Sequence, residues 1–173
     1  MTKQEMQAVA RQVAESNDLP PSGFVAQISQ ESNWNQYAVS PVGAMGLAQF
    51  MPATWAEWGA GLDPFDPLAS LSAGARYMRW VQQWLISQGL TGSWSETLAA
   101  YNWGIGNVRN GFQNYGGSWL SYAPLETRNY VAKIAPFYEA SEEMPADPKN
   151  QNSKLGPGFA VLVVSGLILW GIS

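Results

Sequence analysis

Apolar residues recur at steps of three and four positions through most of the first 140 residues of this chain. This is the period of an amphipathic helix, whereas a half-buried strand alternates apolar and polar residues. No stretch of the sequence shows sustained alternation, so a large sheet is not expected. The segments with helical spacing are residues 3–15, 20–33, 69–88, 97–101 and 126–139. The sequence therefore predicts a mainly α fold.

Glycine- and proline-rich connections separate the predicted helices, at residues 40–46, 59–67, 89–93 and 104–117. The whole chain has 173 residues, a length that is typical of one domain. After residue 140 the composition changes, because little remains there that could be buried in a core. We therefore expect one compact domain over residues 1–140.

The far end of the sequence is an uncharged, apolar run over residues 155–172, which follows the last charged residue, Lys154. As a helix it would be about 27 Å long, close to the roughly 30 Å thickness of a bilayer's hydrocarbon core. We expect a transmembrane helix over 155–173 that contacts a lipid bilayer through 155–172; a buried C-terminal helix is the alternative. Residues 141–154, rich in Glu, Pro, Asp, Asn and Lys, are expected to form a flexible linker.

The residue inventory excludes several classes of function. The chain has no Cys and no His, which rules out disulfides, zinc sites built from these residues, Cys nucleophiles and Ser-His triads. Its net charge of −4 argues against nucleic-acid binding, which needs clustered Lys and Arg. We expect no cofactor and no metal site. Any catalysis must then depend on carboxylates.

One carboxylate has an unusual position, on the predicted helix 20–33. Phe24, Ile28 and Glu31 fall at i, i+4 and i+7, which places Glu31 on the apolar stripe of that helix. Loss of water disfavours the charged form of an acid, so its pKa should be raised. A general acid needs such an environment to keep its proton at neutral pH. The alternative is a glutamate at a fraying helix end that turns to solvent.

Four motifs follow one another between residues 19 and 138. They are Glu31-Ser32 with SPVGAMGLAQFMPATW at 40–55, FDP at 65–67 with SAGARYM at 72–78, AAYNWGIGNV at 99–108, and ETRNYVAKI at 126–134. In this order the motifs resemble those of the soluble lytic transglycosylase family, which has a goose-type lysozyme fold. The resemblance implies a helical, lysozyme-like domain with a cleft that binds peptidoglycan glycan strands. It also implies cleavage of the β-1,4 bond between N-acetylmuramic acid and N-acetylglucosamine.

The resemblance also implies roles for single residues. Glu31 would act first as the catalytic acid and then as the base, so that a 1,6-anhydro sugar forms without water. Tyr101 would orient this acid or the N-acetyl group of the substrate. The residues implied to bind the saccharide are Ser40, Gln49, Met51, Asn102, Glu126 and Tyr130.

Structural roles are the alternative for several of these positions. Met51 and Trp55 would then be core residues, Tyr130 would be part of a packed helix surface, and Glu126 would be a first-turn acid favoured by the helix dipole. The 9 Trp residues of the chain cannot all stack on sugars. Trp80 and Trp84 are predicted to lie in the core, because they are one helical turn apart on a predicted helix.

Two other classes of function remain open from the sequence. One is a hydrolytic lysozyme on the same fold, in which a second carboxylate such as Asp63 or Asp66 holds the attacking water. The other is a glycan-binding or virion structural protein without catalytic activity.

The expected location follows from the two ends of the sequence. The first eighteen residues lack the apolar stretch of an export signal, and Lys149 and Lys154 precede the apolar run, which favours a cytoplasmic domain. Because peptidoglycan lies outside the cytoplasmic membrane, we expect a protein anchored in the membrane of a phage particle. Such a protein would act in the host periplasm and cell wall and would have other virion proteins as partners. A cellular tail-anchored enzyme is the alternative.

Overall fold

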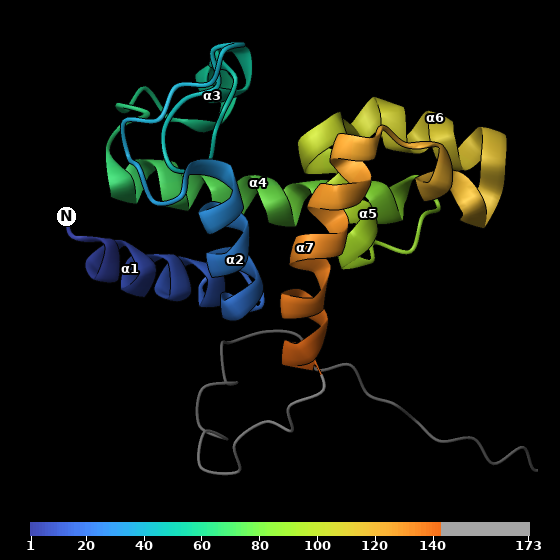
Figure 1. Ribbon diagram of the computed structural model, residues 1–173, viewed down its shortest axis with the longest axis horizontal. Coiled ribbons are helices and arrows are strands. Elements are labelled where there is room, and N and C mark those ends of the chain that lie inside the picture. Colours follow the sequence, from blue (N-terminus) through green and yellow to red (C-terminus); the bar gives the residue numbers. More distant parts are fainter. Residues whose placement is uncertain (143–173) are drawn as a thin grey trace, which may run out of the picture.

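The computed structural model describes residues 1–142, and these residues form a mainly helical fold (Figure 1). The α-helices are α1 (Lys3–Glu15), α2 (Pro21–Ser32), α3 (Pro52–Trp58), α4 (Pro67–Ser87), α5 (Trp94–Trp103), α6 (Ile105–Tyr115) and α7 (Leu125–Glu142), with a 3₁₀ helix, η1 (Gly116–Tyr122), between the last two. The helices expected at 3–15, 20–33, 69–88, 97–101 and 126–139 are confirmed as α1, α2, α4, α5 and α7. In the described residues, extended pairing is limited to isolated bridges that join Met45 to Val39 and to Phe50.

Local sequence explains where the main helices begin. The side chains of Thr2 and Ser93 accept hydrogen bonds from the backbone of Glu5 and Glu96, and these glutamates bond back in two capping boxes that start α1 and α5. The Asp66 carboxylate accepts from the backbone N–H of Ala69 at 2.8 Å and caps α4. Helix α2 begins with Pro21, whose fixed φ suits a first helical position.

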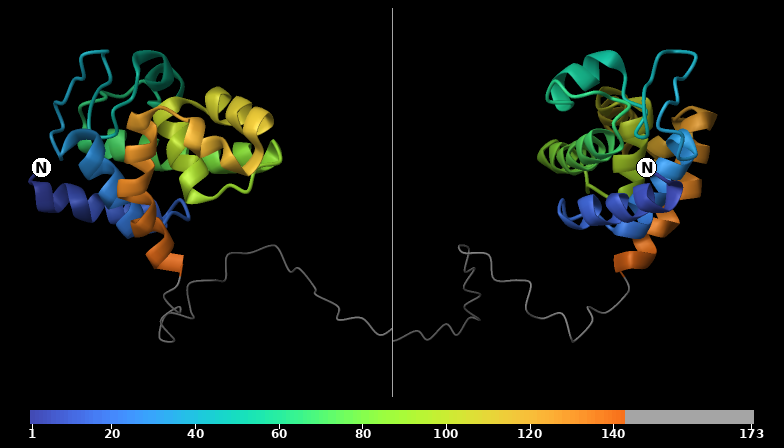
Figure 2. Two further views of the ribbon diagram at one scale, coloured as in Figure 1. Left: turned by 45° about the vertical axis from the view of Figure 1, so that its right-hand side comes forward. Right: turned by 90° about the vertical axis from the view of Figure 1, so that its left-hand side faces the viewer.

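Helix α4 is central to the core and packs against both α1 and α5. Helix α2 lies against α1 and α7, while the segment between α2 and α4, which includes α3, lies on the opposite side of α4 from α1 (Figures 1 and 2). Each fully buried aliphatic side chain stabilises the fold by roughly 1.5–3 kcal/mol. The largest fully buried aliphatic side chains are Ile28, Leu47, Leu71, Met78, Leu85, Leu98 and Ile134.

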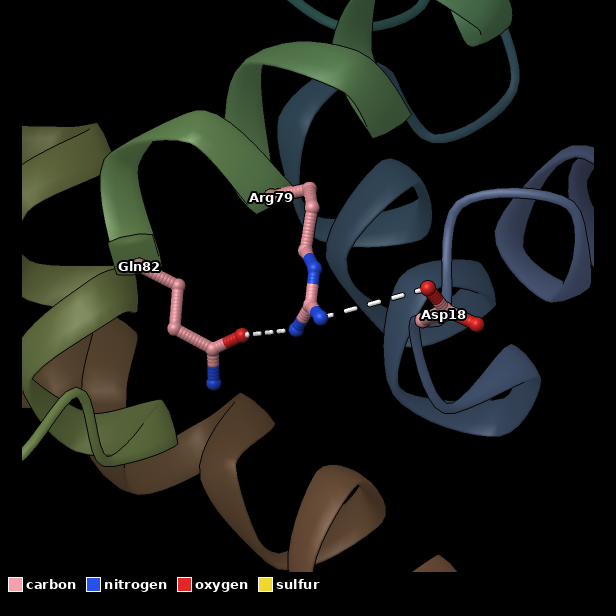
Figure 3. Close-up of polar contacts among 3 residues, drawn as sticks. All are labelled: Asp18, Arg79 and Gln82. Atoms are coloured by element: carbon pink, nitrogen blue, oxygen red, sulfur yellow. Dashed lines mark hydrogen bonds and ion pairs between the residues drawn. The ribbon is translucent and has the colours of Figure 1, made fainter. Parts of the chain in front are cut away.

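Arg79 of α4 links two neighbouring turns (Figure 3). Its guanidinium lies 3.9 Å from the carboxylate of Asp18, in the turn between α1 and α2, and it donates to the side chain of Gln82 at 2.8 Å. Gln82 in turn donates to the carbonyl of Gly92, which precedes α5, at 2.9 Å. Since the ion pair is exposed, it contributes at most about 1 kcal/mol. Its main effect is to orient these turns on α4.

Two expectations about the helical domain are wrong, one for residues 104–117 and one for Trp80. The glycine-rich segment 104–117, expected to be a connection, forms α6 and the start of η1. Gly104, with φ +101°, separates α5 from α6, and Gly116, with φ +56°, ends α6. Gly111 lies inside α6 close to the side chains of Trp103 and Trp119, so packing offsets its low helix propensity. Trp80, expected in the core, is 37% exposed, because its face of α4 borders a pocket, where its ring contacts Tyr77 and Trp58 of α3 but is not covered.

Helix α7 continues to Glu142, two residues past the expected domain boundary at 140. The rest of the expected linker, 143–154, and the expected transmembrane helix, 155–173, lie outside the described residues. Within residues 1–142, no helix combines the length and the apolar character needed to cross a bilayer.

Candidate active site

Glu31 lies in the last turn of α2, one turn after Gln27 and Ile28, which are fully buried. Helix α2 ends just beyond it, because Asn33 and Trp34 adopt left-handed backbone angles of φ +47° and +67° and turn the chain into a loop. Burial raises the pKa of the Glu31 carboxyl to about 7, and a hydrogen bond from Tyr130 partly opposes that rise. The predicted place of Glu31 on the apolar stripe and its raised pKa are confirmed.

The hydrogen bond to Glu31 comes from α7, 99 residues further along the chain. The Tyr130 hydroxyl donates to Oε1 of Glu31 at 2.5 Å. Burial, followed by the nearby Glu31 charge, raises the pKa of Tyr130 well above its ordinary value, so this phenol keeps its proton and remains a donor. Tyr130 therefore contacts the carboxyl from the buried side and stabilises its charged form.

A second hydrogen bond of the same kind joins α2 and α7. The Tyr138 hydroxyl donates to Oε1 of Gln27 at 2.7 Å, and both side chains are fully buried. Gly23 makes this approach possible, because a Cβ at that position would lie within 2.3 Å of the Tyr138 ring. These two bonds fix α2 against α7 and with it the position of Glu31.

The loop after α2 folds back on itself through its own backbone and side chains. Gly46, with φ +73°, lies so close to the backbone of Pro64 that a Cβ there would come within 2.1 Å of the Pro64 carbonyl oxygen. The Gln49 amide group donates to the carbonyls of Ala38 and Gly46 at 3.3 and 2.9 Å. The Ser40 hydroxyl accepts from the backbone of Ala44 at 3.0 Å. This loop is therefore a fixed wall beside Glu31.

Glu31, this loop, the end of α5 and the start of α7 line a pocket of about 300 Å³. Its lining residues are Glu31, Ser40, Val42, Ala44, Gln49, Met51, Tyr101, Asn102 and Glu126. Seven of the eight residues expected at the site thus line one pocket, and the eighth, Tyr130, is buried behind Glu31. Val42 and Ala44 were not expected at the site, although they lie inside the motif at 40–55.

Tyr101 and Asn102 join the pocket to the rest of the fold. The Tyr101 hydroxyl donates to the carbonyl of Ala48 at 2.7 Å, so it anchors the loop to α5, while the hydrogen bond to Glu31 comes from Tyr130. The side-chain oxygen of Asn102 accepts from the Thr127 hydroxyl at 2.8 Å and links α5 to α7. The Asn102 side chain is therefore held in one orientation at the pocket.

The alternatives for the remaining positions are decided by exposure. Met51 is 43% exposed and lines the pocket, so the core alternative is wrong for it, whereas Trp55 is buried in the core. Glu126 is both an acid of the first turn of α7 and a residue of the pocket. Trp84 is half-buried against the core.

Asp63 and Asp66, the two candidates for a second catalytic carboxylate, and the buried Glu96 make hydrogen bonds outside the Glu31 pocket. Asp63 accepts from the backbone of Phe65 at 2.9 Å, Asp66 caps α4, and neither lines the pocket. Glu96 is buried and accepts from the Thr91 hydroxyl and the backbone of Gly92. Glu126 is the second carboxylate of the Glu31 pocket.

Comparisons with known proteins agree with this geometry. Residues 8–119 match the family described as "Transglycosylase SLT domain". A soluble lytic murein transglycosylase of Escherichia coli (strain K12) is 31% identical over 135 residues, covering 69% of this chain and 20% of that protein. The membrane-bound lytic murein transglycosylase F of Haemophilus influenzae (strain PittGG) is 37% identical over 129 residues, covering 66% of this chain and 26% of that protein.

Solved structures show the same likeness. The crystal structure of the 70 kDa soluble lytic transglycosylase from Escherichia coli matches with a TM-score of 0.65 and 30% identity, over 78% of this chain and 23% of that one. A complex of the 70-kDa soluble lytic transglycosylase with bulgecin A matches with a TM-score of 0.67 and 28% identity, over 79% of this chain and 24% of that one. The chain thus spans about a fifth to a quarter of the length of these relatives. With its lysozyme-like helical fold, this chain belongs to the family of the transglycosylase SLT domain.

Proposed function

We propose that this domain is a peptidoglycan lytic transglycosylase that cleaves the β-1,4 bond between N-acetylmuramic acid and N-acetylglucosamine. The observation that carries the proposal is the Glu31 carboxyl, which has a pKa raised to about 7 by burial and lies at a pocket lined with hydrogen-bonding side chains. The relatives named above are lytic transglycosylases, which supports the same assignment. An acid with this pKa can give up a proton and take one back near neutral pH.

In the proposed reaction, Glu31 first donates its proton to the oxygen that bridges the two sugars. The bond between C1 of the muramic unit and that oxygen then breaks, and its electron pair leaves with the oxygen. The C6 hydroxyl oxygen of the muramic unit forms a new bond to C1, and Glu31 takes up the hydroxyl proton. The products are a 1,6-anhydro sugar and a free hydroxyl group, and Glu31 is protonated again.

Tyr130 can stabilise Glu31 at the step of the reaction where the Glu31 carboxyl has lost its proton. Its hydroxyl donates to the Glu31 carboxyl and its own pKa is raised, so it supplies a charge-assisted hydrogen bond without giving up its proton. We assign Tyr130 to positioning Glu31 rather than to binding sugar, because it is buried behind the acid. Tyr101 is assigned to holding the loop at Ala48 in place beside the substrate.

The remaining pocket residues are proposed to bind the saccharide. The Ser40 hydroxyl and the Asn102 amide group can donate to acetamido and hydroxyl groups, and the side-chain oxygen of Gln49, whose amide N–H groups are bonded within the loop, can accept from them. The exposed side chain of Met51 offers an apolar contact for a sugar face. The hydrogen bonds that Ser40, Gln49 and Asn102 make within the fold fix the orientations of these three side chains. Fixed donors and acceptors reduce the entropy lost on binding.

A hydrolytic lysozyme is the second candidate, and Glu126 is the observation in its favour. This residue is a second carboxylate on the same pocket, and two carboxylates are what most glycoside hydrolases use to activate water or to form a covalent intermediate. The product of the reaction separates the two candidates, because a transglycosylase consumes no water.

Mass analysis of purified peptidoglycan digested with this protein is therefore expected to show anhydro-muramic ends. Each anhydro fragment is lighter by one water than the corresponding hydrolytic product, and digestion in ¹⁸O-labelled water should leave the new sugar ends unlabelled. A digest dominated by labelled reducing ends would establish the hydrolase instead. Undigested wall under all conditions would contradict both candidates.

We also propose that residues 155–172 anchor the domain in a lipid bilayer, in a phage particle that brings it to the host wall. The uncharged apolar run supports the anchor. Lys149 and Lys154 on its domain side would keep the domain in the cytoplasm, so we propose that a phage particle brings it to the wall from outside. The whole chain should float with lipid vesicles in a density gradient, while a chain ending at residue 142 should remain at the bottom. Detection in host membranes but never in purified particles would rule out the phage assignment.

A further inference from the structure

Two fully buried polar side chains, Gln27 of α2 and Tyr138 of α7, take no part in the reaction above. The Tyr138 hydroxyl donates to the side-chain oxygen of Gln27 at 2.7 Å, and burial raises the pKa of Tyr138 well above its ordinary value, so this phenol remains a donor. Within residues 1–142, no protein atom accepts a hydrogen bond from the other end of the amide, Nε2 of Gln27. The described part of the protein thus satisfies only one end of this buried amide.

Such a pair is a poor source of stability. A neutral hydrogen bond has a small net effect on folding, and a buried donor that the protein leaves unpaired offsets that gain. Apolar side chains of similar shape, methionine at position 27 and phenylalanine at position 138, would bury a similar surface without this loss. The Gln27–Tyr138 pair therefore calls for a role other than stabilising the fold.

The place of the pair indicates what this role is. Gln27 lies one turn before Glu31 on α2, and Tyr138 lies two turns after Tyr130 on α7. The two helices pack against each other, but apolar contacts are non-directional and do not select one register of α7 along α2. A buried polar contact can select it. The Gln27–Tyr138 bond fixes one point of the interface, about 12 Å along α7 from the bond between Tyr130 and Glu31.

The Tyr138 ring is itself held in place by two other helices. Gly23 of α2 lies so close that a Cβ there would come within 2.3 Å of the ring. Trp94 of α5 stacks on the same ring, with centroids 4.5 Å apart and planes 26° apart. A shift of α7 along α2 would break both contacts. Tyr138 is therefore a fixed point from which α7 places Tyr130.

We propose that Gln27 and Tyr138 are positioning residues for the reaction, whose hydrogen bond sets the register of α7 on α2 that brings the Tyr130 hydroxyl to Glu31. This inference rests on the proposed function, in which Glu31 moves the proton. It assigns the pair to the rate of the reaction and not to the stability of the fold.

The test is the double variant Gln27→Met/Tyr138→Phe, which replaces both polar groups with apolar ones of similar shape. We expect its kcat to fall by about tenfold, because a small displacement of a catalytic group lowers the rate steeply. Its KM should stay within about twofold of wild type, because neither residue lines the Glu31 pocket. The urea midpoint of unfolding should be equal to that of wild type or higher.

The pH dependence is a readout that a merely structural role would not move. The other titratable groups near Glu31 are Tyr101, Tyr130 and Glu126, and the raised pKa of both phenols keeps them neutral. Without the Tyr130 bond, the effect of burial on Glu31 is unopposed, so the alkaline fall of kcat/KM should move to higher pH in the double variant. The same shift in a Glu126→Gln background would assign it to Glu31. Adding Tyr130→Phe to the double variant should then cost little more, since both changes remove one contact.

Thr97→Val is the matched control, because it removes another fully buried polar group, whose hydroxyl donates to the Ser93 carbonyl within α5 and its cap. It should leave kcat and the pH profile unchanged. Three results would overturn the positioning role. They are a double variant that is unfolded or clearly less stable than wild type, a wild-type kcat with an unmoved alkaline fall, and a full additional loss when Tyr130→Phe is added.

Failure of the proposed function gives a different result from failure of the positioning role. If the wild-type protein releases no anhydro ends, the proposed function is wrong, and the pKa of Glu31 can still be followed through stability. For this, urea unfolding of the double variant is compared with that of the double variant carrying Glu31→Gln, and the two curves should diverge up to a higher pH than in the wild-type background. If the wild type releases anhydro ends and this range of pH is the same in both backgrounds, only the positioning role is wrong.

Discussion

Replacing Glu31 with glutamine is expected to lower wall cleavage by about a thousandfold. The reason is that a positioned general acid–base residue usually contributes a factor of 10² to 10⁴, and an amide can neither donate nor recover the proton. Glutamine has nearly the same shape, and its carbonyl oxygen can still accept the hydrogen bond from Tyr130. The measurement is the initial rate at which anhydro fragments are released from purified peptidoglycan by Glu31→Gln and wild-type protein at equal concentration.

Two further glutamate variants make the Glu31 result specific. Glu15→Gln, on the exposed face at the end of α1, should cleave at the wild-type rate, because it removes a charge far from the pocket lining. Glu126→Gln, at the pocket itself, should lose less than about tenfold if Glu31 alone moves the proton. A loss as large as that of Glu31→Gln would contradict the single-acid reaction and favour two carboxylates. Retained activity in Glu31→Gln would remove Glu31 from the mechanism.

The helices that sequence periodicity predicted are those whose apolar face packs on the core. Helix α6 was missed for a physical reason: glycine has a low helix propensity, and the sequence does not show that Gly111 packs against Trp103 and Trp119. Trp80 was misplaced for a related reason. Helical spacing shows which residues share a face of α4 but not whether that face meets another helix or a pocket.

The sequence predicted which residues belong to the site but not which hydrogen bonds they make with one another. The family motifs brought seven residues to one pocket, although they lie on three helices and a loop. The bond from Tyr130 to Glu31 was not predicted, because a motif gives a position on α7 and not the direction of the side chain. One signal was present: Gln27 and Glu31 are one turn apart on α2, and Tyr130 and Tyr138 are two turns apart on α7. The two bonded pairs run in opposite directions along α2 and α7, as in antiparallel helices, but their spacings differ, so this signal alone does not fix the pairing.

The raised pKa of Glu31 predicts that the active site lowers the stability of the protein as the pH rises. In the unfolded chain this carboxyl loses its proton near its ordinary pKa of 4.5, whereas in the folded state it does so at about 7. Below about pH 4 both states are protonated, and the favourable contribution of the group is complete. Between about pH 4.5 and 7 the unfolded state alone releases the proton, so this contribution is lost, at about 1.4 kcal/mol per pH unit.

In Glu31→Gln the amide at position 31 does not titrate, so the free energy of unfolding of this variant should not show this loss. Relative to wild type, the variant should gain about 3 kcal/mol between pH 4 and pH 8, as an upper value because Glu31 is only half-buried. Urea unfolding of both proteins across this range measures the difference. Parallel stability curves for the two proteins would contradict a raised pKa at Glu31.

Tyr130→Phe extends this argument to the hydrogen bond. The Tyr130 hydroxyl lowers the pKa of Glu31 against the effect of burial, so its removal should raise that pKa above 7. The stability curves of Tyr130→Phe and of the double variant Tyr130→Phe/Glu31→Gln should then continue to diverge up to a higher pH than those of wild type and Glu31→Gln. The fall of kcat/KM at alkaline pH should also move to higher pH. A purely structural role for Tyr130 would lower stability equally at every pH. A shift of both midpoints in the same direction would therefore identify Tyr130 as the residue that keeps Glu31 able to return to its charged form during each turnover.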